Sequence, residues 1–569
     1  MIKNKLKDIT NFLSGAIILS LILIFSYFSF FKIDLTEDDR FTLHDSTIEL
    51  ISNLDDVVEF KIYLDSDHLP ANLTRVKSSI IETIEEFSDL SDGDIEYEFI
   101  DVYKDIEDPK AREKELLRLQ KKGLQLKIIA VPNLNGQVER IYIPLGAIAF
   151  HNGRSITVPF TRQKKGNNPT SYEKEIEELE FEITNGIRKL RQDTMKNVAF
   201  LQGHGELGRY DVEDFSKALY EYYQTGPAYL TDKEGNSKIK ALNGVDLLVI
   251  AKPMEKFTQK EQFILDQFIM KGGKVLWMLE GARGAELDSM QTQGLLFPSP
   301  LETGLDAMLF KYGVRVDKNI VEDLQCSKIP IQTTANGDGR GFKLYKWIYN
   351  PVLTPNNKHL ITKNLNPIKL EFASSLDSVP VKGVSHFTLL ATSGNNRYKK
   401  LPSRITFNET ANREIKPHTF TGGKRPIAML LEGNFDSYFK NRIAPSFANH
   451  PSIDFKTKSE STNMIVISDG DICKNWFSSK NEIIPLGTDQ FTKVHYDNKK
   501  FLVNCANFLL DDEELIEVRS KKIKMRLLDP KLVKDEKSFM QLLNVGLPFA
   551  LILLFSFAFI FFRKMRFSK

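Results

Sequence analysis

Two long stretches without a charged side chain, one near each end of the sequence, constrain this chain more than any other feature. Residues 9–31 and 538–562 form uncharged stretches of 23 and 25 residues. A helix as long as the first stretch measures roughly 34 Å, and the hydrocarbon core of a bilayer is about 30 Å thick. The first stretch also lacks the small-residue cleavage pattern of a signal peptide, so an uncleaved anchor is the better interpretation. We therefore expect a transmembrane helix at each end.

The charges that flank these stretches predict the orientation of the chain. Three lysines lie within residues 3–7, and four basic residues lie within residues 563–569. Basic flanks stay in the cytoplasm, which predicts an inner-membrane protein with both termini cytoplasmic and the central region periplasmic. The local charge of residues 521–537 instead indicates a cytoplasmic location for this segment, because it has seven basic and three acidic side chains. The terminal charges receive more weight here, because a large domain is translocated largely regardless of its own charge.

Two residues of the second stretch predict a contact inside the membrane. Pro548 has no backbone N–H, so it should kink the helix and free a carbonyl that needs a neighbouring helix or water. Gly546 would let another helix approach closely. We expect Gly546 and Pro548 to pack on a partner helix, and a lone, kinked anchor is the alternative.

Charge balance, cysteine count and the glycine-lysine pairs exclude several functions. The chain has 77 basic and 75 acidic residues, a net charge of +2, which argues against a nucleic-acid partner. Three cysteines are too few for a disulfide framework or a four-thiolate zinc site. The pairs Gly273-Lys274 and Gly423-Lys424 both lack the Ser or Thr of a P-loop. If the protein performs ATP-driven work, a partner supplies the energy.

Apolar periodicity between the two ends predicts α/β structure. In a first domain, residues 38–165, strands over 57–64 and 95–102 flank a helix, and a further helix and strand over 109–131 would complete a βαβαβ unit with an antiparallel extension. The helix carries apolar residues at helical spacing, namely Leu73, Val76, Ile80, Ile84 and Phe87.

Short, fully apolar runs predict parallel strands that are covered on both faces. These runs are Val198–Leu201, Leu247–Ala251, Val275–Leu279, Ile427–Leu431 and Met464–Ser468. The first three belong to a second domain, residues 171–290, and the others to a third region, residues 299–530. The predicted fold class is therefore α/β, with two terminal transmembrane helices (9–31 and 538–562) enclosing a large periplasmic region of Rossmann-like, doubly wound modules.

The sharpest local motif is a G-x-G-x-x-G over residues 203–208, between a predicted strand and a predicted helix. This pattern is typical of dinucleotide sites. However, Glu206 and the acidic residues at 211–214 lie where a pyrophosphate needs bare amides, and we expect these acids to cap the helix instead. His204 and Glu206 remain weak candidates for a ligand, metal or general-base site, with a polar turn as the alternative.

A second acidic pair follows the predicted strand that ends at Ser468. Asp469 and Asp471 could hold a cation through two carboxylates, or form an ordinary turn between strand and loop. Neither a G-x-S-x-G motif nor a cysteine-histidine nucleophile pair is present in the sequence. We therefore predict no catalytic residues, no metal site, no cofactor and no enzymatic activity.

Several stretches taken together resemble a known family. They are residues 41–47, 197–206, 246–253, 266–275, 426–435 and 464–471. The sequence resembles auxiliary, substrate-binding-like subunits of bacterial ABC transporters, and among them the gliding-motility (GldG) family of Bacteroidota. Its second module is similar to intraflagellar-transport-type domains. The resemblance implies a GldF-like permease and a GldA-like ATPase as partners, with links to gliding and type IX secretion, but it implies no catalytic residues.

Three hypotheses follow from these observations. The first is a non-enzymatic accessory subunit whose membrane helices pack on a permease. The second is a membrane-tethered solute receptor with a cleft near His204 or Asp469. The third is a membrane-anchored periplasmic enzyme that uses the same carboxylates.

Overall fold

The computed structural model divides the chain into two compact units, Leu43–Lys521 and the two ends, Met1–Thr42 with Lys522–Lys569. The structure describes residues 14, 15, 17, 18, 20, 42–132, 138–160, 176, 178–191, 195–231, 240–287, 294–335, 339–407, 415–443, 454–478, 480–510 and 537–567. The five separate residues near the start are helical. The rest of the expected first span, 9–31, lies outside the described residues.

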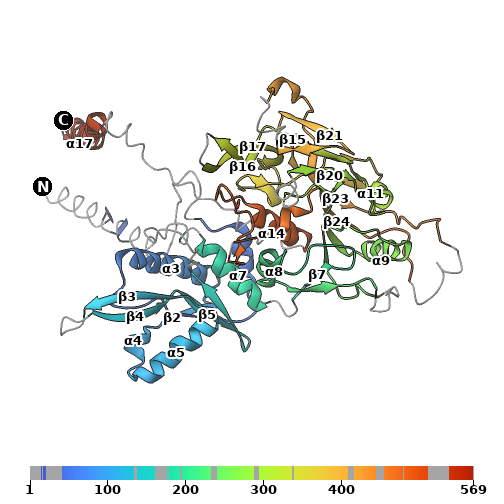
Figure 1. Ribbon diagram of the computed structural model, residues 1–569. Helices are drawn as coiled ribbons and strands as arrows, with labels where there is room; N and C mark the ends of the chain where they lie inside the picture. Colours follow the sequence, from blue (N-terminus) through green and yellow to red (C-terminus); the bar gives the residue numbers. More distant parts are fainter. Residues whose placement is uncertain are drawn as a thin grey trace. The chain divides into compact units, whose positions relative to one another are not determined.

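The larger unit begins with α2 (Asp45–Ser52) and a four-stranded sheet (Figure 1). Strands β1 (Val58–Ile62) and β2 (Ile95–Phe99) are parallel and are joined by α3 (Ala71–Leu90). β5 (Gly146–His151) and β6 (Arg154–Pro159) extend the sheet antiparallel, in the order β2-β1-β5-β6. The five apolar residues that predicted α3 are its five buried residues. Each such side chain contributes about 1.5–3 kcal/mol when it leaves water.

Our expectation of a third parallel strand in this sheet is wrong. β3 (Leu126–Pro132) pairs instead with β4 (Val138–Pro144) in a separate antiparallel hairpin. Only residues 133–137 separate the two strands, and a parallel pair would need a crossover of about a dozen residues or more. Helix α5 (Pro109–Lys121), preceded by α4 (Val102–Asp105), packs on β4.

Helix α7 (Leu179–Arg191) belongs to the core of this first sheet. Leu179, Ile183, Ile187 and Leu190 join its hydrophobic cluster. Gly186 permits the close packing, because a Cβ at this position would lie 2.7 Å from a methyl group of Val158. The core of the first sheet therefore extends to Arg191, beyond the boundary expected near residue 171.

A seven-stranded sheet forms the rest of the frame of this unit. Its strands are β7 (Asn197–Leu201), β8 (Gln224–Ala228), β9 (Leu247–Ala251), β10 (Lys274–Met278), β20 (Val384–Ala391), β23 (Pro426–Gly433) and β24 (Thr462–Ile467). Their order is β20-β23-β24-β10-β9-β7-β8, in which β24 to β8 are parallel and β23 is antiparallel to both of its neighbours. Strands from the second and third predicted regions thus lie in one sheet.

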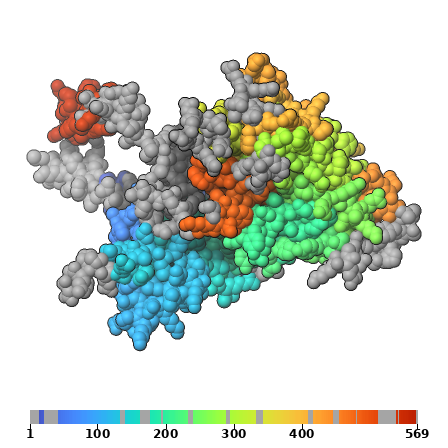
Figure 2. Space-filling model, viewed as in Figure 1, coloured from blue at the N-terminus to red at the C-terminus, as the bar shows by residue number. Residues whose placement is uncertain are grey.

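Helices cover both faces of this sheet, which explains why its central strands, such as β9, are apolar throughout. Helices α8 (Glu213–Tyr220) and α14 (Asn498–Leu509) share one hydrophobic cluster with Val249 and its neighbours on the same face. Helices α9 (Gln259–Met270) and α11 (Asp306–Tyr312) share the other cluster with Leu248 and Ile250. In the space-filling view the orange-red surface of α14 lies against the green segment that contains α8 (Figure 2).

Shorter strands form small sheets that are separate from the seven-stranded sheet. They are β11 (Ala282–Arg283) with β13 (Ser299–Pro300), β12 (Leu295–Leu296) with β22 (Ile405–Thr406), β14 (Val314–Val316) with β19 (Leu376–Ser378), β15 (Asn319–Asp323) with β21 (Asn396–Lys400), β16 (Cys326–Ala335) with β17 (Gly339–Leu353) and β18 (Ile368–Lys369), and β25 (Trp476–Phe477) with β26 (Ile483–Ile484). Single 3₁₀ turns lie at Leu360–Thr362, Pro417–Thr419 and Asp471–Cys473. Trp347, Tyr349 and Phe372 centre a separate apolar cluster here.

Two contacts join the start of the seven-stranded module to its end. Lys196 Nζ, next to β7, donates to the backbone carbonyl of Leu510, directly after α14. Tyr223 OH donates to Asn507 Oδ1 at 2.9 Å. The chain therefore enters and leaves this module at one place.

The smaller unit contains α17 (Lys537–Phe567), one uninterrupted helix that passes through Pro548. Residues Leu542–Met565, 24 in all, are long and apolar enough to cross a membrane, and none of them is buried in the protein. Within the described ranges this is the one helix of that kind. Helix α17 contains all of the expected second span, 538–562, and the apolar stretch Leu542–Met565 contains most of it.

Candidate functional site

Sequence-predicted candidates lie at the carboxyl edge of the parallel strands. The chain order reverses at β7, because β8 lies on one side of it and β9 on the other. In open α/β sheets, ligands bind at such a reversal, beyond the carboxyl ends of the strands. The G-x-G-x-x-G loop follows β7 at this point. Its Gly203 and Gly205 have φ of +122° and +72°, which favour glycine.

His204 is buried within this loop and lies between two glutamates. Its Nδ1 lies 3.3 Å from Glu206 Oε1, and its Nε2 lies 3.2 Å from Glu261 Oε1. Its ring stacks on Phe257 with centroids 3.8 Å apart. Glu261 is oriented by the capping box of α9, in which Thr258 and Glu261 bond each other's backbone. The histidine thus joins the loop after β7 to the start of α9.

The acids of the motif occupy the amides that a phosphate would need. Glu206 accepts from the backbone N–H of His204 at 2.6 Å, and Asp211 accepts from that of Gly208 at 2.9 Å. Our expectation that these acids cap α8 is wrong, because its N-cap residue, Val212, makes no side-chain cap bond. Asp214 instead accepts from the backbone of Leu486 at 2.8 Å. These carboxylates therefore accept hydrogen bonds from the backbone of loops and do not cap the helix.

The environment of His204 favours its charged form. Burial lowers the pKa of His204, but hydrogen bonds and charges from Glu206 and Glu261 outweigh burial and raise the pKa above its usual value. For Glu261, burial acts in the opposite direction to the Thr258 and His204 contacts, which prevail and lower its pKa. We read this group as a buried ion pair and not as a general base, because a base needs a lone pair that is free to accept a proton.

Asp469 and Asp471 belong to a second buried network, built around Lys252. Lys252 Nζ lies 2.5 Å from Asp471 Oδ2. Asp469 accepts from the backbone N–H groups of Asp471 at 2.9 Å and Glu371 at 2.7 Å. Glu280, just beyond β10, accepts from the N–H of Gly470 at 2.9 Å. The network joins the loops that follow β9, β10 and β24.

The backbone of this network is tightly constrained. Lys252 adopts φ +57°, a left-handed conformation that is uncommon for a residue with a side chain. A Cβ at Gly470 would lie 2.7 Å from the Cβ of Lys252, so the position requires glycine. The two loops are therefore in direct backbone contact beside the ion pair.

Burial shifts the pKa values of the ionisable groups in the second network. Burial, reinforced by neighbouring carboxylates, raises the pKa of Asp469 well above its usual value, and burial likewise raises that of Glu280 despite the nearby Lys252. The pKa of Lys252 is lowered by burial but raised by Asp471 and Glu280, and the net shift is upward. One buried cation thus lies among three buried carboxyl groups.

A third ion pair lies beside the second network. Lys369 Nζ lies 2.9 Å from both Glu371 and Asp489. A pocket of about 30 Å³ is lined by Lys369, Glu371, Asp469 and Asp471. This volume is far below the roughly 300 Å³ of a typical small-molecule site.

The structure keeps the two predicted pairs in separate networks. His204 and Glu206 meet Glu261, whereas Asp469 and Asp471 meet Lys252 and Glu280. Among the described residues, no group of three or more His, Cys, Asp or Glu side chains could hold a metal ion. The geometry of these described residues supports ionic cross-links between loops.

Comparisons with known proteins place the chain in a transport family. Residues 195–505, more than half of the chain, match the family described as "ABC-type uncharacterized transport system", and residues 37–149 match a domain of unknown function, DUF7088. An uncharacterized protein of Borreliella burgdorferi is 23% identical over 449 residues, covering 78% of this chain and 80% of its own. A solved structure, the mmIFT52 N-terminal domain, is similar at 16% identity and a TM-score of 0.32, over 55% of this chain and 97% of its own. The seven-stranded module and its networks thus lie in the matched region, and the chain belongs to this family of ABC transporter auxiliary proteins.

Proposed function

We propose that this chain is a non-enzymatic accessory subunit, anchored by α17 beside the permease of an ABC transport system. The family match supports an accessory role in transport. The observation that carries the membrane contact is that no residue of the apolar stretch Leu542–Met565 is buried in the protein. An exposed side chain of this kind loses about 1.5–3 kcal/mol relative to a buried one, so the stretch requires lipid or another protein around it.

Gly546 and Pro548 are the positions where the permease contact is proposed. Pro548 lies inside α17 and donates no hydrogen bond to the carbonyl of Asn544, four residues earlier. In a bilayer that carbonyl needs a donor from a neighbouring helix or water. A Cβ at Gly546 would meet only Leu542 of the same helix, at 3.6 Å, so a side chain fits the isolated helix.

The finer parts of the proposal rest on the sequence. The resemblance to gliding-motility auxiliary proteins supports a GldF-like permease, a GldA-like ATPase and a role in gliding linked to type IX secretion. The basic residues at both ends support an inner-membrane protein with cytoplasmic termini, a first span at 9–31 and a periplasmic central region. The absence of a P-loop from the sequence supports an ATPase partner as the source of energy.

The receptor and enzyme hypotheses require a ligand near His204 or Asp469. His204 is 6% exposed, and the pocket beside Asp469 measures about 30 Å³. The carboxylates of Glu206, Glu261 and Asp471 lie against His204 and Lys252 in ion pairs. The carboxyl edge therefore offers no support for either hypothesis.

Purification of the tagged full chain in mild detergent tests the proposal. The wild-type chain is expected to retain an ABC permease and its ATPase. Gly546→Leu should release both, because the new side chain projects from a helix that accommodates it and must displace a neighbour. Val545→Leu, the adjacent and already exposed position, is the matched control. Wild-type chain that purifies without any transporter subunit would refute the proposal.

A further inference from the structure

A second pocket, of about 430 Å³, is lined by charged residues that belong to none of the networks described above. It lies where β14, β19 and the start of β23 meet. Its charged lining residues are Arg315, Asp377, Lys424 and Arg425. Pockets that bind small molecules commonly measure about 300–1,000 Å³, so this one has the size of a ligand site.

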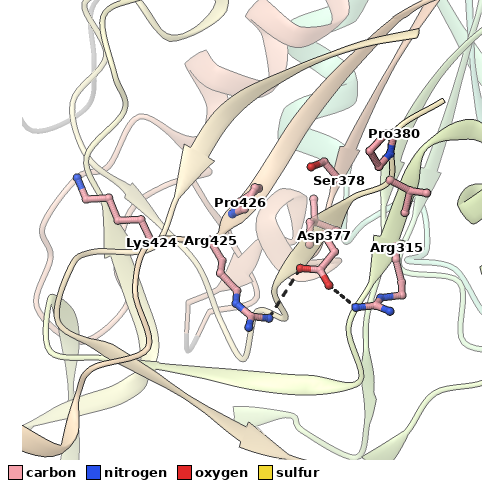
Figure 3. Close-up of a pocket in the computed structure, with 9 residues that line it drawn as sticks. Arg315, Asp377, Ser378, Pro380, Lys424, Arg425 and Pro426 are labelled. Carbon is pink, nitrogen blue, oxygen red and sulfur yellow. Dashed lines mark hydrogen bonds and ion pairs between the residues drawn. The ribbon is translucent and has the colours of Figure 1, made fainter. Parts of the chain in front are cut away.

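Strand pairing places the first arginine. Arg315 and Asp377 are directly opposite each other in the antiparallel pair of β14 and β19. Arg315 Nη2 donates to Asp377, and Arg315 Nε lies 3.2 Å from Asp317. Asp377 thus has its charge compensated by the residue across the strand. Figure 3 shows the guanidinium groups of Arg315 and Arg425 converging on Asp377 from two sides.

The second arginine is held in position before any ligand arrives. Arg425 Nη1 lies 3.2 Å from Asp317 and 3.8 Å from Asp377. Its guanidinium carbon lies 4.7 Å from the ring centroid of Tyr398, within the range of a cation–π contact. A guanidinium fixed in this way loses little conformational entropy when it binds a further group.

The loop that carries Lys424 and Arg425 is fixed as well. The carbonyl of Gly423 accepts hydrogen bonds from Asn396 Nδ2 at 2.8 Å, Tyr398 OH at 3.0 Å and Thr392 Oγ1 at 3.3 Å. Three side chains thus anchor one backbone carbonyl just before the two basic residues. Lys424 itself is exposed and extends away from Asp377 (Figure 3).

Charge and donor geometry together define the ligand class. Three cations, Arg315, Lys424 and Arg425, and two carboxylates, Asp317 and Asp377, lie at or beside the pocket, which leaves one net positive charge. Arginine's planar fork of donors matches the oxygens of phosphate and carboxylate groups. We propose that this pocket binds the oxyanion group, phosphate or carboxylate, of a small solute, with Arg425 and Lys424 as its donors. The site is independent of the permease contact of α17.

Calorimetric titration of the full chain in detergent tests this proposal with inorganic phosphate, citrate and uncharged glycerol as probes. At least one of the two oxyanions should bind saturably with one-to-one stoichiometry, and glycerol should not. Lys424→Gln should weaken that binding roughly threefold to tenfold, the loss of one exposed charge-assisted contact. Lys121→Gln removes the same charge from exposed α5 and should change nothing.

Asp377→Asn distinguishes an oxyanion from other classes of ligand by the direction in which the binding affinity changes. Removing this carboxylate frees Arg315 and leaves the pocket more positive, so oxyanion binding should tighten severalfold. Weaker binding in Asp377→Asn would show that the carboxylate itself holds the ligand, as it would for an amine. That result, or the absence of saturable binding of both oxyanions to the wild-type chain, would overturn the proposal.

Discussion

Lys252 combines two unfavourable features at one residue. Its backbone is left-handed, a strain that costs about 1–3 kcal/mol, and its ammonium group is buried. Asp471 and Glu280 offset the burial of the charge. Such a residue persists only where its surroundings hold it firmly. We infer that Lys252 closes the loops at the carboxyl edge against each other.

Removing that cation should destabilise the fold in a pH-dependent way. Lys252→Met leaves buried carboxyl groups without their counter-ion, which costs about 3–5 kcal/mol. Because burial raises the pKa of Glu280 and Asp469, the folded state favours their protonated forms, and stability is lost as pH rises through the folded pKa values. The deficit should therefore grow with pH. Denaturant unfolding monitored by tryptophan fluorescence measures it, with exposed Lys260→Met as the control.

His204 should make stability fall as the solution becomes alkaline. Its folded pKa is raised above the ordinary value of about 6.5, so its contribution is complete below that value and is lost as pH rises through the folded pKa. Between about pH 6 and about pH 8, His204→Gln should show a flatter dependence of the unfolding free energy than the wild type. His68→Gln, at an exposed position, should keep the wild-type slope. Equal slopes for wild type and His204→Gln would contradict the buried ion pair.

Sequence reasoning found two members of each network. His204 with Glu206, and Asp469 with Asp471, were visible because each pair is local in the sequence. Lys252 and Glu280 were missed, although both follow apolar strand runs directly, and that position was the available signal. Glu261 was visible only as the last residue of the capping pattern T-x-x-E, which says nothing of a distant histidine. Partners from separate strands depend on sheet order, which local patterns do not encode.

At the scale of single elements, the proposed permease contact of α17 depends on the carbonyl of Asn544. This carbonyl receives no hydrogen bond within the helix, because Pro548 has no backbone N–H. Pro548→Ala supplies an N–H to the carbonyl of Asn544 and straightens the hydrogen-bond ladder. If the permease satisfies that carbonyl, the variant should retain roughly fivefold to thirtyfold less permease after purification, since contacts of this kind contribute about 1–2 kcal/mol. Leu547→Ala serves as a control at the neighbouring position. Undiminished permease in Pro548→Ala would place the contact elsewhere.

Elements with strong periodicity were predictable, and their pairing was not. All five apolar positions of α3 are buried, and the run Leu247–Ala251 is β9. The run over 126–131 was correctly read as a strand but assigned to the wrong sheet, because an apolar run does not specify its neighbour. The sheet that helix α7 covers depended on the close approach at Gly186, which no apolar periodicity marks.

For the whole molecule, the burial of its thiols permits a clean test of sidedness. Cys473 and Cys505 are fully buried, and burial raises the pKa of Cys326 to about 11. Native thiols should therefore react slowly with maleimides, which need the thiolate. An engineered Lys121→Cys should be labelled by a membrane-impermeant maleimide once the outer membrane is opened. Lys564→Cys should be labelled only after lysis, and the reverse pattern would contradict the periplasmic placement.

The joining of Lys196 to the carbonyl of Leu510 has a mechanical consequence. Tension that reaches residue 510 from the direction of α17 meets this clasp before it meets any strand of the seven-stranded sheet. The force can then pass to the start of the module through the hydrogen bonds of Lys196 with Leu510 and of Tyr223 with Asn507, without crossing a strand of the seven-stranded sheet.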